Sequence, residues 1–159
     1  MRALIDTNVL MDTIFSREPF NKDSDKILDM VCEKKIDGCV SVQSLRDIFY
    51  FCKKINNSNN HISIIEKLSF IFEVIDVNGQ DSFSALMSDI EDYEDGLLAF
   101  SAHRNYIKII ITRNEKDYYD SDLVIINPKE IDKYINTDLE AGSVVIDNTF
   151  FSVCDPKQG

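Results

Sequence analysis

Four aspartates stand at points of the sequence where carboxylates could act together. Asp6 directly follows the apolar run Ala3-Leu4-Ile5, which is typical of a buried strand, and a carboxylate in that place rarely has a packing role. Asp47 and Asp95 are expected on the first turns of two helices, and Asp117 follows a further apolar run. In open α/β sheets, sites form outside the carboxyl ends of the strands. We therefore expect the four carboxylates to meet at that edge, provided that the helix of Asp95 begins there.

The other three aspartates, unlike Asp6, also have simpler explanations when they are taken singly. Asp47 and Asp95 would interact favourably with the helix dipole on any first turn. Asp92 would serve as a helix cap, with Asp95 as an acidic residue three positions later. Asp117 would form a local turn through its own backbone. The case for a shared site therefore depends on the set and its order.

Hydrophobic periodicity predicts the elements that would position these residues. Helical spacing alternates with short apolar runs, which indicates βαβ units. The predicted fold is a three-layer α/β/α domain with a central parallel sheet of about five strands. No helix is predicted between residues 6 and 20, where Val9-Leu10-Met11 leads to a loop broken by Pro19. Strands are expected at 3–5, 39–42, 72–77, 107–111 and 123–126, and helices at 21–35, 44–56, 61–69, 81–91, 92–105 and 128–135.

Composition limits the classes of function. The chain has 159 residues, the size of one ordinary domain, and a formal net charge of −11. This charge argues against a protein that holds nucleic acid by bulk electrostatics, and permits either a cation-collecting pocket or a surface for a basic partner. No apolar run approaches the roughly 20 residues that span a bilayer. Met1 leads directly into a strand pattern without a signal peptide, which predicts a cytoplasmic protein.

Residues 1–137 form the predicted domain, and residues 138–159 form a C-terminal extension outside the pattern. Two apolar clusters, 144–146 and 150–151, flank Asp147-Asn148, so a hairpin or an added edge strand is expected there. Two interpretations stay open for this extension. It packs on the domain's own surface, or it contacts a partner protein or a second copy of the chain in a homodimer.

The four aspartates stand in four motifs that follow one another along the chain. The motifs are Asp6-Thr7-Asn8-Val9-Leu10-Met11-Asp12, Ser44-Leu45-Arg46-Asp47-Ile48, Asp92-Tyr93-Glu94-Asp95-Gly96-Leu97 and Thr112-Arg113-Asn114-Glu115-Lys116-Asp117-Tyr118. This ordered set resembles the PIN domain family over about residues 1–136. The resemblance implies a metal-dependent nuclease, most often a ribonuclease acting on RNA, whose acidic residues hold Mg²⁺ or Mn²⁺. Many bacterial members are VapC-type toxins that a cognate antitoxin protein neutralises.

Carried over by position, the resemblance assigns roles to individual residues. The aspartates at 6, 47, 95 and 117 become the catalytic and metal-binding quartet. Two departures concern this set: Asp47 is one methylene shorter than the glutamate common there, and Gly96 replaces a small helix former. The expected polar supports are Asn8, Thr112 and Asn114, and the expected substrate contacts are Arg113 and Lys116.

Other classes with acidic pockets fit the sequence less well. A response-regulator receiver would need paired acids after the first strand, and a phosphatase of the DxD type would need an acid where Asn8 stands. A PIN-like binding or scaffold module with little or no catalysis stays open as the alternative function.

Overall fold

The computed structural model describes residues 1–55, 60–118 and 121–138, and its centre is a parallel sheet of five strands. The strand order is β3-β2-β1-β4-β5, so the first strand lies in the middle of the sheet. All four strand pairs are parallel, which confirms the predicted fold class. The strands are β1 (Arg2–Ile5), β2 (Asp37–Ser41), β3 (Glu73–Ile75), β4 (Ile109–Ile111) and β5 (Val124–Ile126).

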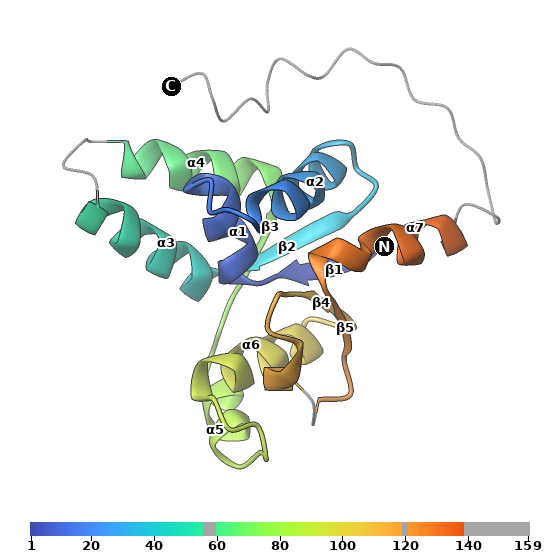
Figure 1. Cartoon of the computed structure of the whole chain (residues 1–159). Coiled ribbons are helices and arrows are strands. Elements are labelled where there is room, and N and C mark those ends of the chain that lie inside the picture. Colours follow the sequence, from blue (N-terminus) through green and yellow to red (C-terminus); the bar gives the residue numbers. More distant parts are fainter. Residues whose placement is uncertain (56–59, 119–120, 139–159) are drawn as a thin grey trace.

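Helices cover both faces of the sheet. Figure 1 shows α1 to α4 and α7 on one side and α5 with α6 on the other. None of the helices in the described part of the chain is long and apolar enough to cross a bilayer. The helices are α1 (Thr7–Ile14), α2 (Asn21–Cys32), α3 (Val42–Ile55), α4 (His61–Ile71), α5 (Gly79–Leu86), α6 (Tyr93–Arg104) and α7 (Ile131–Asp138), with the 3₁₀ helices η1 (Glu115–Tyr118) and η2 (Pro128–Glu130).

Alternate residues of the central strand supply two separate cores. Ala3 and Ile5 belong to the core under α1 to α4, whereas Leu4 belongs to the core under α6. All three side chains are 0 % exposed. A strand covered on both faces has no polar side, and this explains why the sequence of β1 is continuously apolar.

Helix α1 was not predicted from the sequence. It begins at Thr7 directly after the strand, with Asp6 as its N-cap in an extended conformation, and no side-chain hydrogen bond caps it. It has eight residues and no acidic residue in its first turn. The helix buries Val9, Leu10 and Met11. Tertiary packing therefore stabilises a helix that local signals do not specify.

Helix α6 has the orientation that a shared site requires. Asp92 caps it by accepting hydrogen bonds from the backbone N–H groups of Glu94 and Asp95. At its other end, the Asn105 carbonyl accepts a 2.8 Å hydrogen bond from Arg2, at the amino end of β1. The helix thus runs antiparallel to the central strand, and its first turn lies at the carboxyl edge of the sheet.

Gly96 lies where α5 and α6 approach each other. A Cβ at this position would be 3.0 Å from the Ala85 Cβ and 3.4 Å from the Ala85 Cα. The missing side chain therefore permits close packing of the two helices, which offsets the low helix propensity of glycine. Packing against α5 therefore explains why this chain has glycine at position 96, where a small helix former is common.

The predicted hairpin or edge strand of the extension falls on residues 139–159, outside the described part of the chain. The domain boundary at 137 stays a prediction.

We predict that Gly38→Ala destabilises the domain, because a Cβ on this buried strand residue would lie 2.8 Å from both Val31 Cγ atoms and 2.9 Å from Phe72 Cδ1. The expected loss is about 1–3 kcal/mol of the free energy of unfolding. Urea denaturation measures it. Gly79→Ala is the matched control, since nothing lies within 4 Å of its Cβ position. An equal effect of the two substitutions would contradict the packing argument.

Candidate active site

Asp6 is anchored at the carboxyl end of β1 by groups from two other elements. Its side chain is 7 % exposed, and its Oδ2 accepts a 2.7 Å hydrogen bond from Thr112 Oγ1 and a 2.5 Å hydrogen bond from Asn8 Nδ2. Thr112 Oγ1 in turn accepts from the Asn114 backbone N–H at 3.0 Å. Burial raises the pKa of Asp6, and the Thr112 hydrogen bond opposes this. The three expected polar supports therefore belong to one network around Asp6.

Asp95 lies in the first turn of α6 and is half-buried. The Tyr118 hydroxyl donates a 3.0 Å hydrogen bond to its Oδ1. Burial raises the pKa of Asp95 to about 6, and repulsion from the carboxylates of Asp6, Asp92 and Asp117 contributes. The structure thus brings Asp6, Asp95 and Asp117 close enough for their charges to interact.

Asp117 and Asp47 lie on two other elements, η1 and α3. Asp117 is exposed on η1, one residue before the buried Tyr118. Asp47 lies in the second turn of α3 and not in the first, because the helix begins at Val42. It lines a small hollow together with Asp95, and its Oδ1 accepts 3.1 Å and 2.8 Å hydrogen bonds from Arg46. Asp47 is therefore near the other acids, but its charge is partly neutralised.

The polar residues at the end of β2 and the start of α3 were not singled out from the sequence. Thr7 Oγ1 donates to Ser44 Oγ at 2.8 Å, and Ser44 Oγ lies 2.9 Å from Ser41 Oγ. These three residues line the hollow beside Asp47 and Asp95, as does Glu94. Ser41 ends β2, so its position at the strand end was a usable signal. Glu94 adjoins a predicted site residue, but its direction depends on where α6 begins.

Tyr118 had no role in the sequence analysis beyond its place in a motif. Its side chain is 1 % exposed, and burial together with the nearby carboxylates raises its pKa, so the hydroxyl stays protonated. It is thus a permanent donor to Asp95. A phenylalanine at this position would provide no such donor.

The expected substrate contacts differ in their surroundings. Arg113 Nε lies 2.6 Å from Oδ2 of the fully buried Asp12, and its guanidinium lies 4.1 Å from the centre of the Phe20 ring. Lys116 is exposed and adjoins Asp117. Arg113 therefore joins α1 to the loop after β4, and Lys116 has the freer approach to a ligand.

The donors at this edge are oxygen atoms, which suit Mg²⁺ and Mn²⁺. Burial is the main cause of the raised pKa of Asp95, repulsion from Asp6 and Asp117 adds to it, and a divalent cation would relieve that repulsion. Within residues 1–55, 60–118 and 121–138, no three His, Cys, Asp or Glu side chains are already at ligand spacing. The residues thus fit a hard cation in chemistry, and their carboxylates would have to move closer to bind it.

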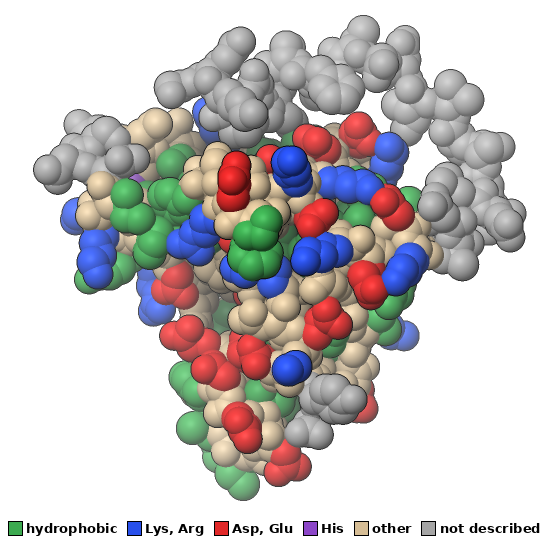
Figure 2. Space-filling model, viewed as in Figure 1, with side chains coloured by type: hydrophobic (Ala, Val, Ile, Leu, Met, Phe, Trp, Pro, Cys, Tyr) green, Lys and Arg blue, Asp and Glu red, His purple; other side chains and the backbone are tan. Residues whose placement is uncertain are grey.

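Basic side chains are unevenly distributed on the surface. On the face in Figure 2, acidic side chains occur over both halves of the molecule, whereas few Lys and Arg side chains accompany them over the lower half, where Figure 1 shows α5 and α6. Exposed acidic residues include Asp89, Glu91, Asp92 and Glu94. An anionic ligand would therefore meet a repulsive field near Asp95.

We predict that Asp95→Asn stabilises the metal-free domain above pH 6 and not at pH 4. The folded-state pKa of about 6 exceeds the ordinary value, so the wild-type protein loses stability as pH rises through that interval, whereas asparagine cannot ionise. The gain is at most about 3 kcal/mol, less solvent screening. Urea denaturation in chelator at several pH values measures it. A difference that does not change with pH would refute the assignment.

We predict that Tyr118→Phe raises the pKa of Asp95 further, because the hydroxyl hydrogen bond stabilises the charged carboxylate. The substitution removes one oxygen and preserves the packed ring. NMR titration of the Asp95 carboxyl carbon in metal-free protein provides the measurement, with Tyr50→Phe on the exposed face of α3 as the control. An unchanged or lowered pKa would contradict the role of Tyr118.

Comparisons with known proteins agree with this architecture. The family model described as "PIN domain" matches residues 2–116. The VapBC2 structure from Rickettsia felis bound to a promoter DNA fragment has a chain that is 18% identical, with a TM-score of 0.61, covering 80% of this chain and 98% of its own. A toxin–antitoxin complex from Klebsiella pneumoniae has 20% identity, a TM-score of 0.59 and coverages of 79% and 97%.

FitAcB from Neisseria gonorrhoeae shares 20% identity, with a TM-score of 0.59 and coverages of 80% and 98%. No curated protein matches the sequence. At these identities the solved structures show the fold alone, whereas the family model spans most of the chain. The protein belongs to the PIN domain family.

Proposed function

We propose that this protein is a metal-dependent endoribonuclease that hydrolyses RNA phosphodiester bonds, and that it is the toxin of a toxin–antitoxin pair. The observation that supports the proposal best is the interaction of Asp6, Asp95 and Asp117 at the carboxyl edge, where burial and repulsion raise the pKa of Asp95 to about 6. Membership of the PIN family, whose members are generally nucleases, agrees with it.

Asp6, Asp95 and Asp117 are the residues that would hold Mg²⁺ or Mn²⁺. Asp47 would participate from the edge of the site, because Arg46 already neutralises part of its charge. A bound divalent ion would activate water against the phosphodiester and stabilise the leaving oxygen.

The protein's own residues then have distinct tasks. Thr112 and Asn8 hold Asp6 in one orientation, and Tyr118 does the same for Asp95. Such hydrogen bonds keep donor atoms in place and sustain the affinity of a metal site. Lys116, exposed beside Asp117, is the proposed phosphate contact, and Arg113 supports it by holding the loop after β4 against α1.

The proposed partner is an antitoxin protein. The solved structures of similar fold include toxin–antitoxin complexes, some of them bound to DNA. A chain with a net charge of −11 would bind a basic antitoxin readily and would repel bulk RNA. Inhibition by such a partner is therefore compatible with the surface of this protein.

A non-catalytic PIN-like binding module is the second candidate. The Arg46–Asp47 ion pair favours it, because it engages one acid of the quartet. The two candidates differ in their response to metal and to substitution of Asp6.

The experiment is cleavage of labelled single-stranded RNA of mixed sequence. We expect cleavage with Mg²⁺ or Mn²⁺ and none in chelator. Asp6→Asn should lower the rate on the order of 100-fold or more, and Asp47→Asn less, because Asp6 is the anchored ligand. The same order should hold for growth arrest when the protein is expressed in bacteria.

Glu66→Gln is the matched control, since it removes an exposed charge on α4. Full activity of Asp6→Asn in a clean preparation would refute the mechanism. If wild-type protein neither cleaves RNA nor gains thermal stability with millimolar Mn²⁺, the binding module is the better description.

A further inference from the structure

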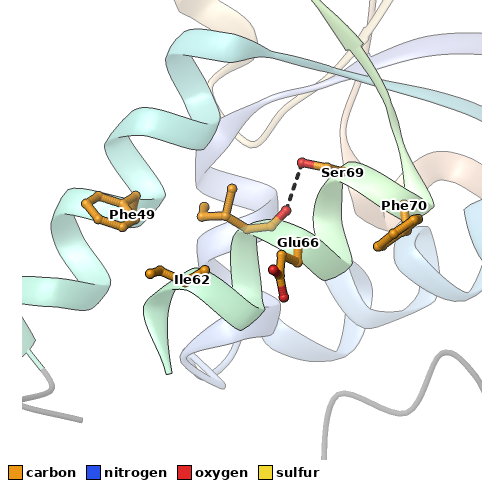
Figure 3. Close-up of a pocket in the computed structure, with 6 residues that line it drawn as sticks. Phe49, Ile62, Glu66, Ser69 and Phe70 are labelled. Carbon is orange, nitrogen blue, oxygen red and sulfur yellow. Dashed lines mark hydrogen bonds between the residues drawn. The ribbon is translucent and has the colours of Figure 1, made fainter. Parts of the chain in front are cut away.

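An apolar groove lies between α3 and α4, away from the carboxylates. Figure 3 shows Phe49 of α3 facing Ile62 of α4. Further along α4 are Glu66, Ser69 and Phe70. Ile62 is 57 % exposed and Phe70 is 91 % exposed. The groove is lined by Phe49, Ile62, Ile65, Glu66, Ser69 and Phe70.

Exposed aromatic and branched side chains of this kind, when contiguous, usually mark a contact surface. The Ser69 hydroxyl is engaged with the Ile65 carbonyl at 2.8 Å, so it directs no polar group into the groove. The groove therefore suits an apolar occupant better than a polar one.

The chain itself contains a segment of matching chemistry. Residues 139–159 include the clusters Val144-Val145-Ile146 and Phe150-Phe151. The family match ends at residue 116. The match with solved structures of similar fold includes 94–98% of their chains but only 79–80% of this one. This protein therefore has residues beyond the shared fold.

The length of the segment is sufficient. Helix α7 ends at Asp138, and Phe150 lies twelve residues further along. At about 3.3 Å per residue this is a reach of roughly 40 Å. A domain of this size has a radius of gyration of about 14 Å, so the reach spans its diameter. Tethering also supplies an effective concentration in the millimolar range, so that even a weak site is occupied.

Charge favours the same pairing, because the two lysines beside the groove, Lys53 and Lys67, outnumber Glu66, which is the one carboxylate in its lining. Lys53 lies one helical turn after Phe49, and Lys67 lies three residues before Phe70, and both are exposed. The segment has three acidic residues, Glu140, Asp147 and Asp155, against Lys157. The other exposed apolar surface, Phe83, Leu86 and Met87 on α5, is followed by Asp89, Glu91 and Asp92, which would repel this segment.

We propose that residues 144–153 dock in the groove between α3 and α4 of the same chain, with Phe150 and Phe151 against Phe49, Ile62 and Phe70. A second copy of the chain is a poorer occupant, because each molecule has a net charge of −11. The inference goes beyond the proposed nuclease function and does not depend on it.

The test uses Cys154 as a site for a nitroxide spin label in full-length Cys32→Ser protein, because Cys39 and Cys52 are buried and Cys32 is half-buried. With isoleucine methyl groups isotope-labelled, the Ile62 and Ile65 signals should lose most of their intensity and recover when the nitroxide is reduced. Phe150→Ser/Phe151→Ser with the same label should abolish the loss. Unchanged Ile62 and Ile65 signals, or equal loss in both proteins, would overturn the proposal.

Two further measurements separate the occupants. Spin-labelled chains without isotope are mixed with isotope-labelled chains without the nitroxide. Loss of signal there would assign the groove to a second copy and overturn docking within one chain.

Hydrogen exchange of α4 amides should be about tenfold faster in Phe150→Ser/Phe151→Ser, and faster by the same factor in Phe70→Asp. Unchanged exchange in both variants would also count against the proposal.

Discussion

The buried carboxylate of Asp6 is the charge around which the carboxyl edge of the sheet is built. A charged group removed from water costs several kcal/mol unless donors compensate it. Thr112 at the end of β4 and Asn8 in α1 supply those donors. Their positions require β1 and β4 to be neighbours and α1 to begin directly after the strand. The topology of the sheet and the start of the first helix are thus coupled to one side chain.

A second carboxylate reaches this edge only because α6 runs antiparallel to the strands. Its far end is held by Arg104, which donates 2.9 Å and 2.8 Å hydrogen bonds to the buried Asp81. Burial would raise the pKa of Asp81, but the hydrogen bonds from Arg104 and the Asn78 backbone lower it overall. Asp81 and Asp95 therefore differ in the charge of the groups around them. Asp81 has a cation and is structural, whereas Asp95 faces other acids and stays available to a ligand.

The distribution of cations follows the same division. Arg113 is engaged with Asp12, Arg46 with Asp47, and Arg104 with Asp76 and Asp81. The two arginines near the site, Arg46 and Arg113, are thus already paired with carboxylates, whereas Arg104 is paired at the far end of α6. An anionic substrate would depend on a divalent ion and on exposed lysine, and the site would respond sharply to loss of either.

The sequence by itself determined the elements with strong local signals. The periodicity of the apolar runs predicted the parallel sheet and six of the helices, and the strand ends located Asp6 and Thr112. Local patterns did not specify α1, which has eight residues and depends on packing. They also did not specify the direction of α6, which is seen only in the contact between Arg2 and Asn105. Three contacts were decided by the tertiary structure alone. Tyr118 donates a hydrogen bond to Asp95, Arg113 forms an ion pair with Asp12, and Gly96 permits the close approach of α5. Each of these contacts joins residues from different elements, and their distance in space is set by the packing of whole helices and strands rather than by neighbouring residues.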